Sequence, residues 1–562
     1  MDYKHRKQIF DQLKNQRKTW DSMYQVLGEY VSQVKQNFEN QHQAGEFMIE
    51  DVYDSTGTFA AHNAASALLG MLWHGTAKQS IEIKAPDDLE VNTELARFYQ
   101  LMTDRTAAAM DDPKANLATS LIEYMLDQII FGTSGIGVES GEDSLLLFKP
   151  YGVKEMYIDE GRSGFVEDVY LLFEWTVKRV VDEYGIDNVS SKVKDLYEDN
   201  NWNSRVKVLV CITKRMNPKA DKGVLAMPYE SLHMEYDNEC HLLKESGFSD
   251  LPIKVGRFKK LNYEKYGRSP AMDALPDIRE ANVLREAVIV ATEKNLDPPL
   301  GVLDDGALGG GVIDTSAGAI SVFNSTSGSG NPVFPLITVG SIPDALARLE
   351  ELKQSISQHF FLDRLLDFNN QTQMTFGEAQ IRNQIRNASL ASIYSRQISE
   401  ILTPLIERVV NLLFQLGEFG VAKGSEQEDE LLAQGIEPEY FPDEIVERLD
   451  AGEDIYSVVY KTQAANAQRS EEYIAILDVL SFNIQAMQVD QSLQYRMNLH
   501  EGIKALSTIR GLPEGIIRQD DEVEKMQQAA EQQAQAMQAM QVAEQGANVV
   551  EKMASANRTV RE

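Results

Sequence analysis

The sequence is 562 residues long and has few of the residues on which several classes of protein depend. Its two cysteines, Cys211 and Cys240, cannot form a disulfide framework, and neither lies in a CxxC pair or near metal-ligand histidines. No run approaches the roughly 18 uncharged apolar residues of a membrane-spanning helix, and residues 1–8 lead into no apolar signal core. We therefore expect a soluble, cytosolic protein without a membrane partner, in which both cysteines are reduced core residues.

The signature motifs of common enzymes are also missing. The chain contains no Gly-Lys dipeptide, which the GxxxxGK[ST] loop of an ATP-driven motor requires. It has no HExxH, no GxSxG and no zinc-type spacing of cysteine and histidine, and its eight histidines are scattered. The sequence therefore predicts no catalytic residue, no cofactor and no metal site.

Positive charge is scarce as well. The chain has 54 Lys and Arg against 86 Asp and Glu, which gives a net charge of −32. Because tight nucleic-acid binding depends on cations that neutralise phosphates, so acidic a protein should touch DNA loosely or only at local basic spots. With 43% hydrophobic and 25% charged residues, the composition is otherwise that of a globular protein. The length fits about three or four domains.

The N-terminal region is predicted to be helical. Apolar residues recur at spacings of three, four and seven from Phe10 to Val34, which is typical of one buried helix face. Further helices are predicted over residues 60–73, 92–110 and 116–131. Beyond them the hydrophobic period changes, which indicates a change from helix to strand.

Residues 144–261 are predicted to form a mostly antiparallel sheet. Short aromatic or β-branched runs such as FVEDVYLLFEW and RVKVLVCIT are bounded by Gly, Asn, Asp or Pro. Two helical stretches, 177–184 and 189–197, interrupt these runs. The pattern favours an α+β layer, in a chain that is predominantly helical, over regular βαβ alternation.

Two helices are predicted to bracket a small insertion. The first begins after Ser269 as N-cap, and Pro276 is expected to kink or restart it. The second begins after Ser341, at the start of a capping-box pattern. Its predicted buried face consists of Leu346, Leu349, Ile356 and Phe360. Between the helices, residues 295–347 contain no Lys or Arg, and short apolar runs among Gly, Ser and Asn predict a few strands.

A polar loop, 363–374, leads into a pattern that predicts one very long helix as far as residue 416. Pro404 is expected to kink this helix, because a mid-helix proline removes one hydrogen bond and clashes with the preceding turn. Residues 426–454 then hold twelve Asp or Glu against one basic residue, which is typical of a solvated face. The rest of the chain, with its Gln- and Ala-rich tail, is predicted to be helical.

Two motifs have a superficial likeness to functional loops. Gly132-Thr-Ser-Gly135-Ile-Gly137 looks like a phosphate-binding loop, but it follows a predicted helix and precedes strands, the reverse of the dinucleotide-binding arrangement. A turn is favoured here. Asp54-Ser-Thr-Gly57 differs from the Asp-Thr/Ser-Gly of aspartic proteases by one intervening residue, so Asp54 or Ser55 is predicted to cap a helix.

Three groups of polar residues are candidates for contacts with other molecules. Arg382 and Arg386 lie one helical turn apart and either meet phosphates or, as we favour, pair with acidic residues within or between subunits. The amides of Asn369, Asn370, Gln371 and Gln373 form either a functional polar loop or a plain solvated turn. A denser basic cluster is interpreted as a self-association surface or solvated face rather than a nucleic-acid site. Its members are Lys254, Arg257, Lys259, Lys260, Lys265 and Arg268.

Several short motifs stand in a particular order along the chain. Val52-Tyr-Asp-Ser-Thr-Gly57 precedes an Ala/Leu-rich helix, Tyr266-Gly-Arg-Ser269 precedes another helix, and Met374-Thr-Phe-Gly-Glu378 opens the long helix. Gly511-Leu-Pro513 and Asp521-Glu-Val523 then precede the Gln/Ala-rich end. This order resembles the portal protein, or head-to-tail connector, of short-tailed, podovirus-type bacteriophages. One departure is Lys78-Gln-Ser-Ile81, where that family often has a Trp-Phe pair.

The resemblance implies a portal architecture. It divides the chain into N-terminal helices with an α/β wing (1–269), two stem helices (270–296 and 342–362), a small β clip (297–341) and a tunnel loop (363–374). A long kinked helix with an acidic wing segment follows over 375–462. Residues 463–562 are then expected to form a helical C-terminal crown.

The resemblance also implies a function and partners. Portals of this kind are dodecameric rings at one capsid vertex of the virion, assembled in the host cytoplasm, through which double-stranded DNA is packaged and ejected without sequence-specific contacts. The implied partners are the large terminase motor, a tail adaptor, the major capsid and scaffolding proteins, and internal core or ejection proteins. The tunnel-loop amides with Arg382 and Arg386 are candidates for the DNA channel. The candidates for motor and tail docking are Asp304, Asp305, Asp314 and Asn324.

Two other classes of function stay open. One is a phage-encoded enzyme with an unrecognised site, and the other is a scaffold or ejection protein of the capsid interior. An ATP- or metal-dependent activity would favour the enzyme. A large ring in the electron microscope would favour the portal.

Overall fold

The computed structural model describes the chain in a series of segments. These are residues 3–32, 38, 52–73, 75–86, 88–89, 91–141, 143–215, 223–237, 240–304, 314–324, 333–336, 340–365, 390–424, 428, 432, 439–461, 476–477, 479, 481–482, 502 and 506. The chain divides into two compact units, Met1–Gln468 and Arg469–Glu562. The first unit contains every element described below.

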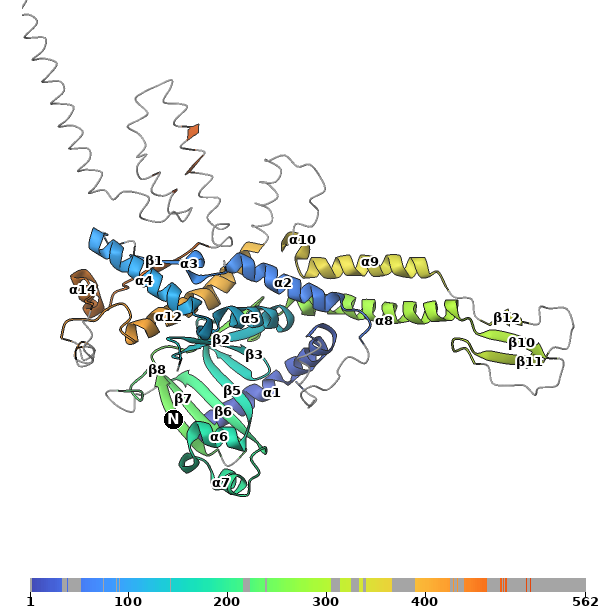
Figure 1. Cartoon of the computed structure of the whole chain (residues 1–562), viewed down its shortest axis with the longest axis horizontal. Coiled ribbons are helices and arrows are strands. Elements are labelled where there is room, and N and C mark those ends of the chain that lie inside the picture. Colours follow the sequence, from blue (N-terminus) through green and yellow to red (C-terminus); the bar gives the residue numbers. More distant parts are fainter. Residues whose placement is uncertain are drawn as a thin grey trace, which may run out of the picture. The chain divides into compact units, whose positions relative to one another are not determined.

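The predicted N-terminal helices are confirmed (Figure 1). They are α1 (Tyr3–Leu27), which continues in a π-helical turn (Gly28–Ser32), α2 (Thr56–Leu72), α4 (Thr93–Asp111) and α5 (Leu117–Phe131). At the start of α2, the Asp54 carboxylate accepts a hydrogen bond from the backbone N–H of Thr56 at 2.9 Å, whereas the Ser55 side chain makes no capping bond. Asp54 is therefore the residue of the two whose side chain supports the start of α2.

A five-stranded sheet confirms the predicted antiparallel layer. Its strands are β4 (Met156–Glu160), β5 (Val166–Thr176), β6 (Arg205–Lys214), β7 (Tyr229–Glu235) and β8 (Leu242–Phe248), and neighbours in this order pair antiparallel. The β5–β6 connection contains α6 (Val177–Tyr184) and α7 (Ser191–Glu198), as predicted. Strands β7 and β8 were not predicted, because YESLHME and LLKESGF mix charged with apolar residues and show weak strand patterns.

A second antiparallel sheet corrects the interpretation of the glycine-rich motif as a turn. Gly132 is the left-handed C-cap of α5, but Thr133–Glu139 form β2, the central strand between β3 (Leu147–Gly152) and β9 (Ile253–Arg257). The glycines of β2 let neighbouring side chains approach, because a Cβ on Gly137 would lie 2.7 Å from a ring carbon of Tyr151. A short two-stranded sheet, β1 (Ile81–Lys84) with β13 (Ser457–Tyr460), joins distant parts of the same unit.

Both cysteines are buried and free, as predicted. Cys211, in β6, packs in a small apolar cluster between the five-stranded sheet and α1, together with Cys240 and Phe10. Burial raises the pKa of the Cys211 thiol well above its ordinary value. The thiol therefore stays protonated and unreactive in the folded protein.

The predicted long helix is described from residue 390 onward, and its hydrogen bonding changes just before Pro404. Residues 390–397 are α-helical, Ile398–Leu402 form a π-helical turn, and α12 (Thr403–Gln415) follows. A π-turn changes the backbone hydrogen bonds locally, and such irregularities often coincide with prolines, which lack an N–H. The π-turn lies immediately before Pro404, and Pro404 itself stands in the first turn of α12, where a proline is tolerated. The kink expected at Pro404 stays a prediction. The acidic segment contributes α14 (Asp443–Ala451).

Candidate functional site: a helical pair with a terminal sheet

Helix α8 (Pro270–Leu296) begins where predicted and is anchored at its first residue. The hydroxyl of Ser269 accepts a hydrogen bond from the N–H of Met272 at 3.0 Å and donates one to the carbonyl of Ile130 at 2.7 Å. The N-cap side chain therefore also ties α8 to α5. The helix continues through Pro276 without a restart.

Helix α9 (Ile342–His359) runs antiparallel to α8 and packs along it (Figure 1). Its N-cap, Ser341, accepts a hydrogen bond from the N–H of Asp344, which confirms the predicted start. Across the pair, the Arg348 guanidinium lies 3.0 Å from the Glu280 carboxylate, and the Ser355 hydroxyl donates to Asp277 at 2.5 Å. We call α8 and α9 together the stem.

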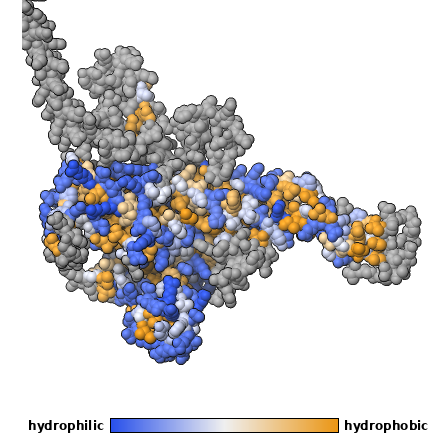
Figure 2. All heavy atoms as spheres, in the orientation of Figure 1, coloured by the Kyte–Doolittle hydropathy of each residue, from blue (hydrophilic) through white to orange (hydrophobic). Residues whose placement is uncertain are grey.

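Burial is uneven over the stem. On α9 and at its C-cap, Leu349, Ile356 and Phe360 are almost fully buried, as predicted, but Leu346 is 41% exposed. On α8, Ile278 and Ala281 face the interior, while a second set of apolar residues is exposed. This set is Val283, Ile289, Val290 and Leu296, and we call it the outer apolar stripe. Hydrophobic residues gather over the stem and over the strands at its end (Figure 2).

The outer apolar stripe is the feature that sequence reasoning missed. Val283 with Val290, and Ile289 with Leu296, each stand seven residues apart, so each pair lies on one side of the helix. Val283 is 64% exposed and Leu296 81% exposed in the single chain. The sequence did contain a signal for it, because these four apolar residues lie outside the apolar stripe that was predicted for α8. At 3.6 residues per turn the two pairs stand about 120° apart around α8, with Glu286 and Glu293 between them. Exposed apolar residues that recur along one side of a helix can be covered by another chain.

The insertion between α8 and α9 forms a three-stranded sheet, which we call the terminal sheet. Strand β10 (Leu300–Asp304) is central, pairs parallel with β11 (Ile320–Asn324) and antiparallel with β12 (Val333–Pro335). The predicted strands are thus confirmed. Strands β11 and β12 are the edges of this sheet, and edge strands expose unpaired backbone groups that can bind another chain.

The predicted docking residues belong to this sheet and its loops. Asp304 ends β10 and Asn324 ends β11, and the parallel register places these two residues opposite each other. Asp314 is exposed, and hydrogen bonds from the side chain and backbone N–H of Ser316 hold the pKa of its carboxyl below the ordinary value. Asp314 is therefore negatively charged at neutral pH. Asp305 lies outside the described residues.

The predicted DNA-channel residues cannot be placed with the stem. Asn369, Asn370, Gln371, Gln373, Arg382 and Arg386 all lie outside the described residues. The start of the predicted loop is helical, since Leu362–Leu365 form the short helix α10 directly after α9.

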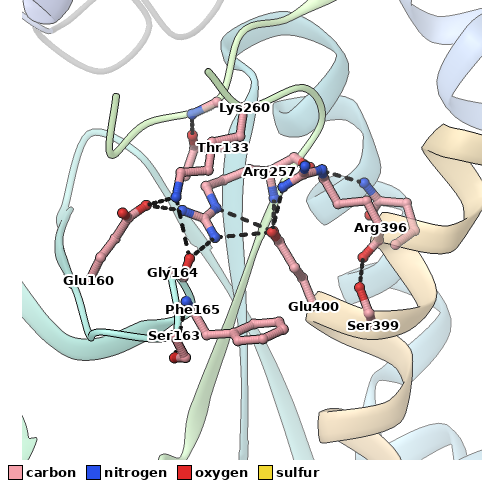
Figure 3. A network of polar contacts seen from close by, with 12 residues as sticks. Thr133, Glu160, Ser163, Gly164, Phe165, Arg257, Lys260, Arg396, Ser399 and Glu400 are labelled. Atoms are coloured by element: carbon pink, nitrogen blue, oxygen red, sulfur yellow. Dashed lines mark hydrogen bonds and ion pairs between the residues drawn. The ribbon is translucent and has the colours of Figure 1, made fainter. Parts of the chain in front are cut away.

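The predicted basic cluster is largely neutralised within the chain rather than free to bind. Arg257 is 1% exposed and lies between the carboxylates of Glu400 and Glu160 (Figure 3). Its backbone N–H and its Nη2 each lie 3.0 Å from the Glu400 carboxylate, which Arg396 also contacts at 2.8 Å. The interpretation as a self-association surface is wrong for Arg257, because long-range packing has buried it.

Other members of that cluster have acidic partners as well. Lys254 lies 3.1 Å from Asp250, Lys260 lies 2.8 Å from Glu160, Lys265 lies 2.7 Å from Asp159, and Arg268 lies 2.6 Å from Glu264. These pairs join β9 and its following loop to the β4–β5 turn and to neighbouring residues. The cluster therefore stabilises the fold at the base of the stem.

Comparison with known protein families identifies the family of this chain. A family model described as bacteriophage head to tail connecting protein matches residues 4–431, which include both sheets, the stem and the terminal sheet. The chain belongs to this family. The connector family thus confirms the predicted identification and the predicted structural role in a phage particle.

Two curated relatives of this connector are portal proteins. The chain is 23% identical to the portal protein of Salmonella phage epsilon15 over 548 residues, which are 96% of this chain and 93% of the relative. It is 25% identical to the probable portal protein of Bordetella phage BPP-1 over 413 residues, or 70% of this chain and 72% of the relative. These alignments extend the similarity over nearly the whole connector.

One solved structure also matches the connector, with a low TM-score. It is a chain of the virion of a native gene transfer agent (GTA) particle, with a TM-score of 0.28 and 11% identity. The match covers 68% of this chain and 90% of that chain. The predicted α+β, predominantly helical fold class is confirmed by the helices and sheets of the connector itself. Among its described helices, none is long and apolar enough to cross a bilayer.

Proposed function

We propose that this connector assembles into a closed, dodecameric ring at one capsid vertex and forms the channel for packaging and ejection of viral DNA. The outer apolar stripe of the stem carries the proposal. A ring of identical subunits needs a heterologous interface, in which one face of a subunit binds a different face of the next. Val283, Val290 and Leu296, exposed in the single chain, would be covered by the neighbouring subunit.

The net negative charge of the chain supports a channel that does not bind DNA tightly. Tight binding to DNA needs many contacts between cationic side chains and phosphates. A net charge of −32 opposes such contacts, because the acidic side chains repel the phosphates. DNA can therefore slide past the subunits without long-lived ion pairs. We propose that the connector itself has no catalytic role and that ATP hydrolysis belongs to a separate motor protein.

The terminal sheet is proposed as the clip, the docking surface for the large terminase motor and later for the tail adaptor. Its edge strands β11 and β12 can pair with a partner, and residues 295–347 carry no Lys or Arg. A partner surface with exposed cations would complement Asp304, Asp305 and Asp314. The remaining proposed partners are the major capsid, scaffolding and internal core or ejection proteins, with the connector in the virion after assembly in the host cytoplasm.

The loop 363–374 is proposed to touch DNA transiently in the channel. Amide side chains can hydrogen-bond phosphates without the ion pairing that would stall movement. Replacing Asn369, Asn370, Gln371 and Gln373 together with alanine should leave ring assembly intact but shorten or destabilise the packaged genome, measured as DNA length per particle. Normal packaging and retention in this variant would assign these amides to an outward-facing turn instead.

Negative-stain electron microscopy of the purified chain tests the ring itself. Closed rings with a central channel are the expected result, and mass photometry should place their mass at a multiple of the 63.1 kDa subunit. A chain that stays monomeric at micromolar concentration, in the presence and absence of the capsid and scaffolding proteins, would contradict the proposal.

A further inference from the structure

A solvent-open cleft of about 600 Å³ lies in the sheet region, outside the stem and the terminal sheet. Its floor is formed by residues of β5, β6, β7 and β8, and its walls come from β2, β3, α6 and α12. Leu171, Val210 and Ile212 supply an apolar patch on this floor. The volume and the mixed apolar and polar lining are typical of a ligand-binding pocket.

A row of aromatic rings runs along the cleft. The ring centroids of Tyr151 and Phe173 are 6.5 Å apart, those of Phe173 and Trp175 are 5.2 Å apart, and those of Trp175 and Tyr184 are 6.3 Å apart. The guanidinium of Arg179 lies 4.3 Å from the Trp175 ring centroid. The row therefore offers apolar ring edges next to a positive charge, an arrangement that suits an aromatic or aliphatic side chain.

Two cations that line the cleft have no acidic partner. Within the part of the chain that the structure describes, neither Arg179 nor Lys244 forms an ion pair, although Glu183 also lines the cleft. His233 pairs with Lys244 across β7 and β8, and its ring nitrogens lie 2.9 Å from the Tyr184 hydroxyl and 3.0 Å from the Ser231 hydroxyl. Burial and the charge of Lys244 lower the pKa of His233 to about 4, so its ring is neutral and adds no positive charge to the cleft.

We propose that this cleft binds an extended peptide segment of another protein, with a bulky apolar side chain over the aromatic row and a carboxylate against Arg179 or Lys244. The two unpaired cations in a strongly acidic chain supply the charge complementarity for that carboxylate. A nucleic acid fits less well, because each of its nucleotides carries a phosphate that Glu139, Glu155 and Glu183 would repel, whereas a peptide needs only one carboxylate beside a cation. The proposal depends neither on the ring nor on the terminal sheet.

The full-length protein labelled with 5-fluorotryptophan tests the site directly, because Trp175 reports from inside the cleft. Two probe peptides, acetyl-Gly-Phe-Asp-Gly-amide and its counterpart with lysine in place of aspartate, are titrated while the Trp175 fluorine resonance is followed, assigned with Trp175→Phe. The acidic peptide should shift this resonance at concentrations at least about fivefold lower than the basic peptide. At about 1.4 kcal/mol per factor of ten in affinity, a difference of about 1 kcal/mol between the two peptides is enough.

The charge-reversed variant Arg179→Glu/Lys244→Glu should abolish or reverse that preference. The matched control is Lys178→Glu, which changes the neighbouring exposed lysine of α6 that does not line the cleft, and the preference should persist there. Should the reversed variant lose its fold, Ser246→Trp fills the cleft from β8 and should weaken both peptides alike.

Several outcomes would overturn the proposal. They are equal response to both peptides, an unmoved Trp175 resonance, or an unchanged preference in the charge-reversed variant. A stronger response to a ten-residue oligothymidylate would instead identify a nucleic-acid site. A shift that appears on concentrating the protein without peptide would identify a second copy of the chain as the occupant.

Discussion

At the scale of single residues, one buried arginine joins three parts of the connector that are far apart in the sequence. Arg257, in β9, bonds to Glu400 in the π-helical turn and to Glu160 at the end of β4, and its Nη2 donates to the carbonyl of Gly164 at 2.9 Å. Both carboxylates would be costly to leave without their partner in this environment. The network therefore fixes the π-turn against the sheet at the base of the stem.

Replacing Arg257 with alanine should lower the free energy of unfolding by about 3–5 kcal/mol, because it leaves the buried Glu400 carboxylate with less compensation. Denaturant unfolding followed by tryptophan fluorescence measures the loss. The control is Arg205→Ala, which removes an exposed ion pair with Glu174 and should cost less than about 1 kcal/mol. Equal losses in the two variants would show that the buried network contributes no more than a surface pair.

A buried histidine makes stability depend on pH. Burial lowers the pKa of His233 from 6.5 to about 4, so the unfolded chain binds a proton at this residue more readily than the folded chain. The stabilisation is present above pH 6.5 and is lost as the pH falls toward 4. Lowering the pH from 7 to 5 should therefore destabilise the native protein more than His233→Gln, measured as the fall in thermal unfolding midpoint. In the control His241→Gln, at an exposed position, the unfolding midpoint should fall as much as in the native protein. If the midpoint of His233→Gln also falls as much as that of the native protein, the effect is disproved.

At the scale of elements, the terminal sheet depends on close contact between β10 and β12. Gly301 faces Phe334 across this pair, and a Cβ on Gly301 would lie 2.7 Å from the tip of the Phe334 ring. A side chain at this position must displace the ring or separate the strands, because interiors of this kind have little free volume. The glycine is thus required by packing rather than by backbone conformation.

Replacing Gly301 with valine should open the β10–β12 pair and speed amide hydrogen exchange in β10 about tenfold or more, since overpacking costs about 1–3 kcal/mol. Exchange in α8 and α9 should stay unchanged. If the terminal sheet docks the motor, the same variant should lose motor binding while rings still form. Gly340→Ala is the control, because nothing lies within 4 Å of a Cβ there. Normal β10 exchange in Gly301→Val would refute the packing argument.

At the scale of the whole molecule, a connector subunit is incomplete as a single chain. Its α8 helix buries one stripe against α9 and the helices of the sheet region and leaves Val283, Ile289, Val290 and Leu296 exposed. Burying apolar surface against a neighbouring subunit is favourable by about 25 cal/mol for each Å² removed from water. Repetition of this small gain around a closed ring can hold the subunits together, and obligate interfaces commonly bury about 2,000–5,000 Å².

The double variant Val283→Glu/Val290→Glu should therefore fold as a monomer but fail to form rings, because each new carboxylate would lose water at the interface. Mass photometry counts the subunits, and circular dichroism checks the fold. The matched control, Ile186→Glu/Val224→Glu, places the same substitution at exposed apolar residues of the sheet region and should still assemble. Rings of normal size from the stem variant would exclude α8 as the interface.

The sequence by itself determined the local structure of this connector. Caps such as Ser269 and Ser341, the helical period and the strand runs depend on residues close in the chain, so they could be predicted without the fold. The order of segments also sufficed to identify the connector family. The glycine-rich β2 and the mixed strands β7 and β8 could not be predicted in this way, because their pairing partners, and not their own residues, make them strands.

Only the tertiary structure decided which side chains are available to other molecules. Arg257 was indistinguishable in sequence from its basic neighbours until packing placed it between Glu160 and Glu400. The outer apolar stripe on α8 and the cleft beside Trp175 likewise emerge only when distant segments cover, or fail to cover, particular faces. Burial and charge pairing are long-range properties, since they depend on residues up to hundreds of positions apart, whereas propensity and capping act within a few residues.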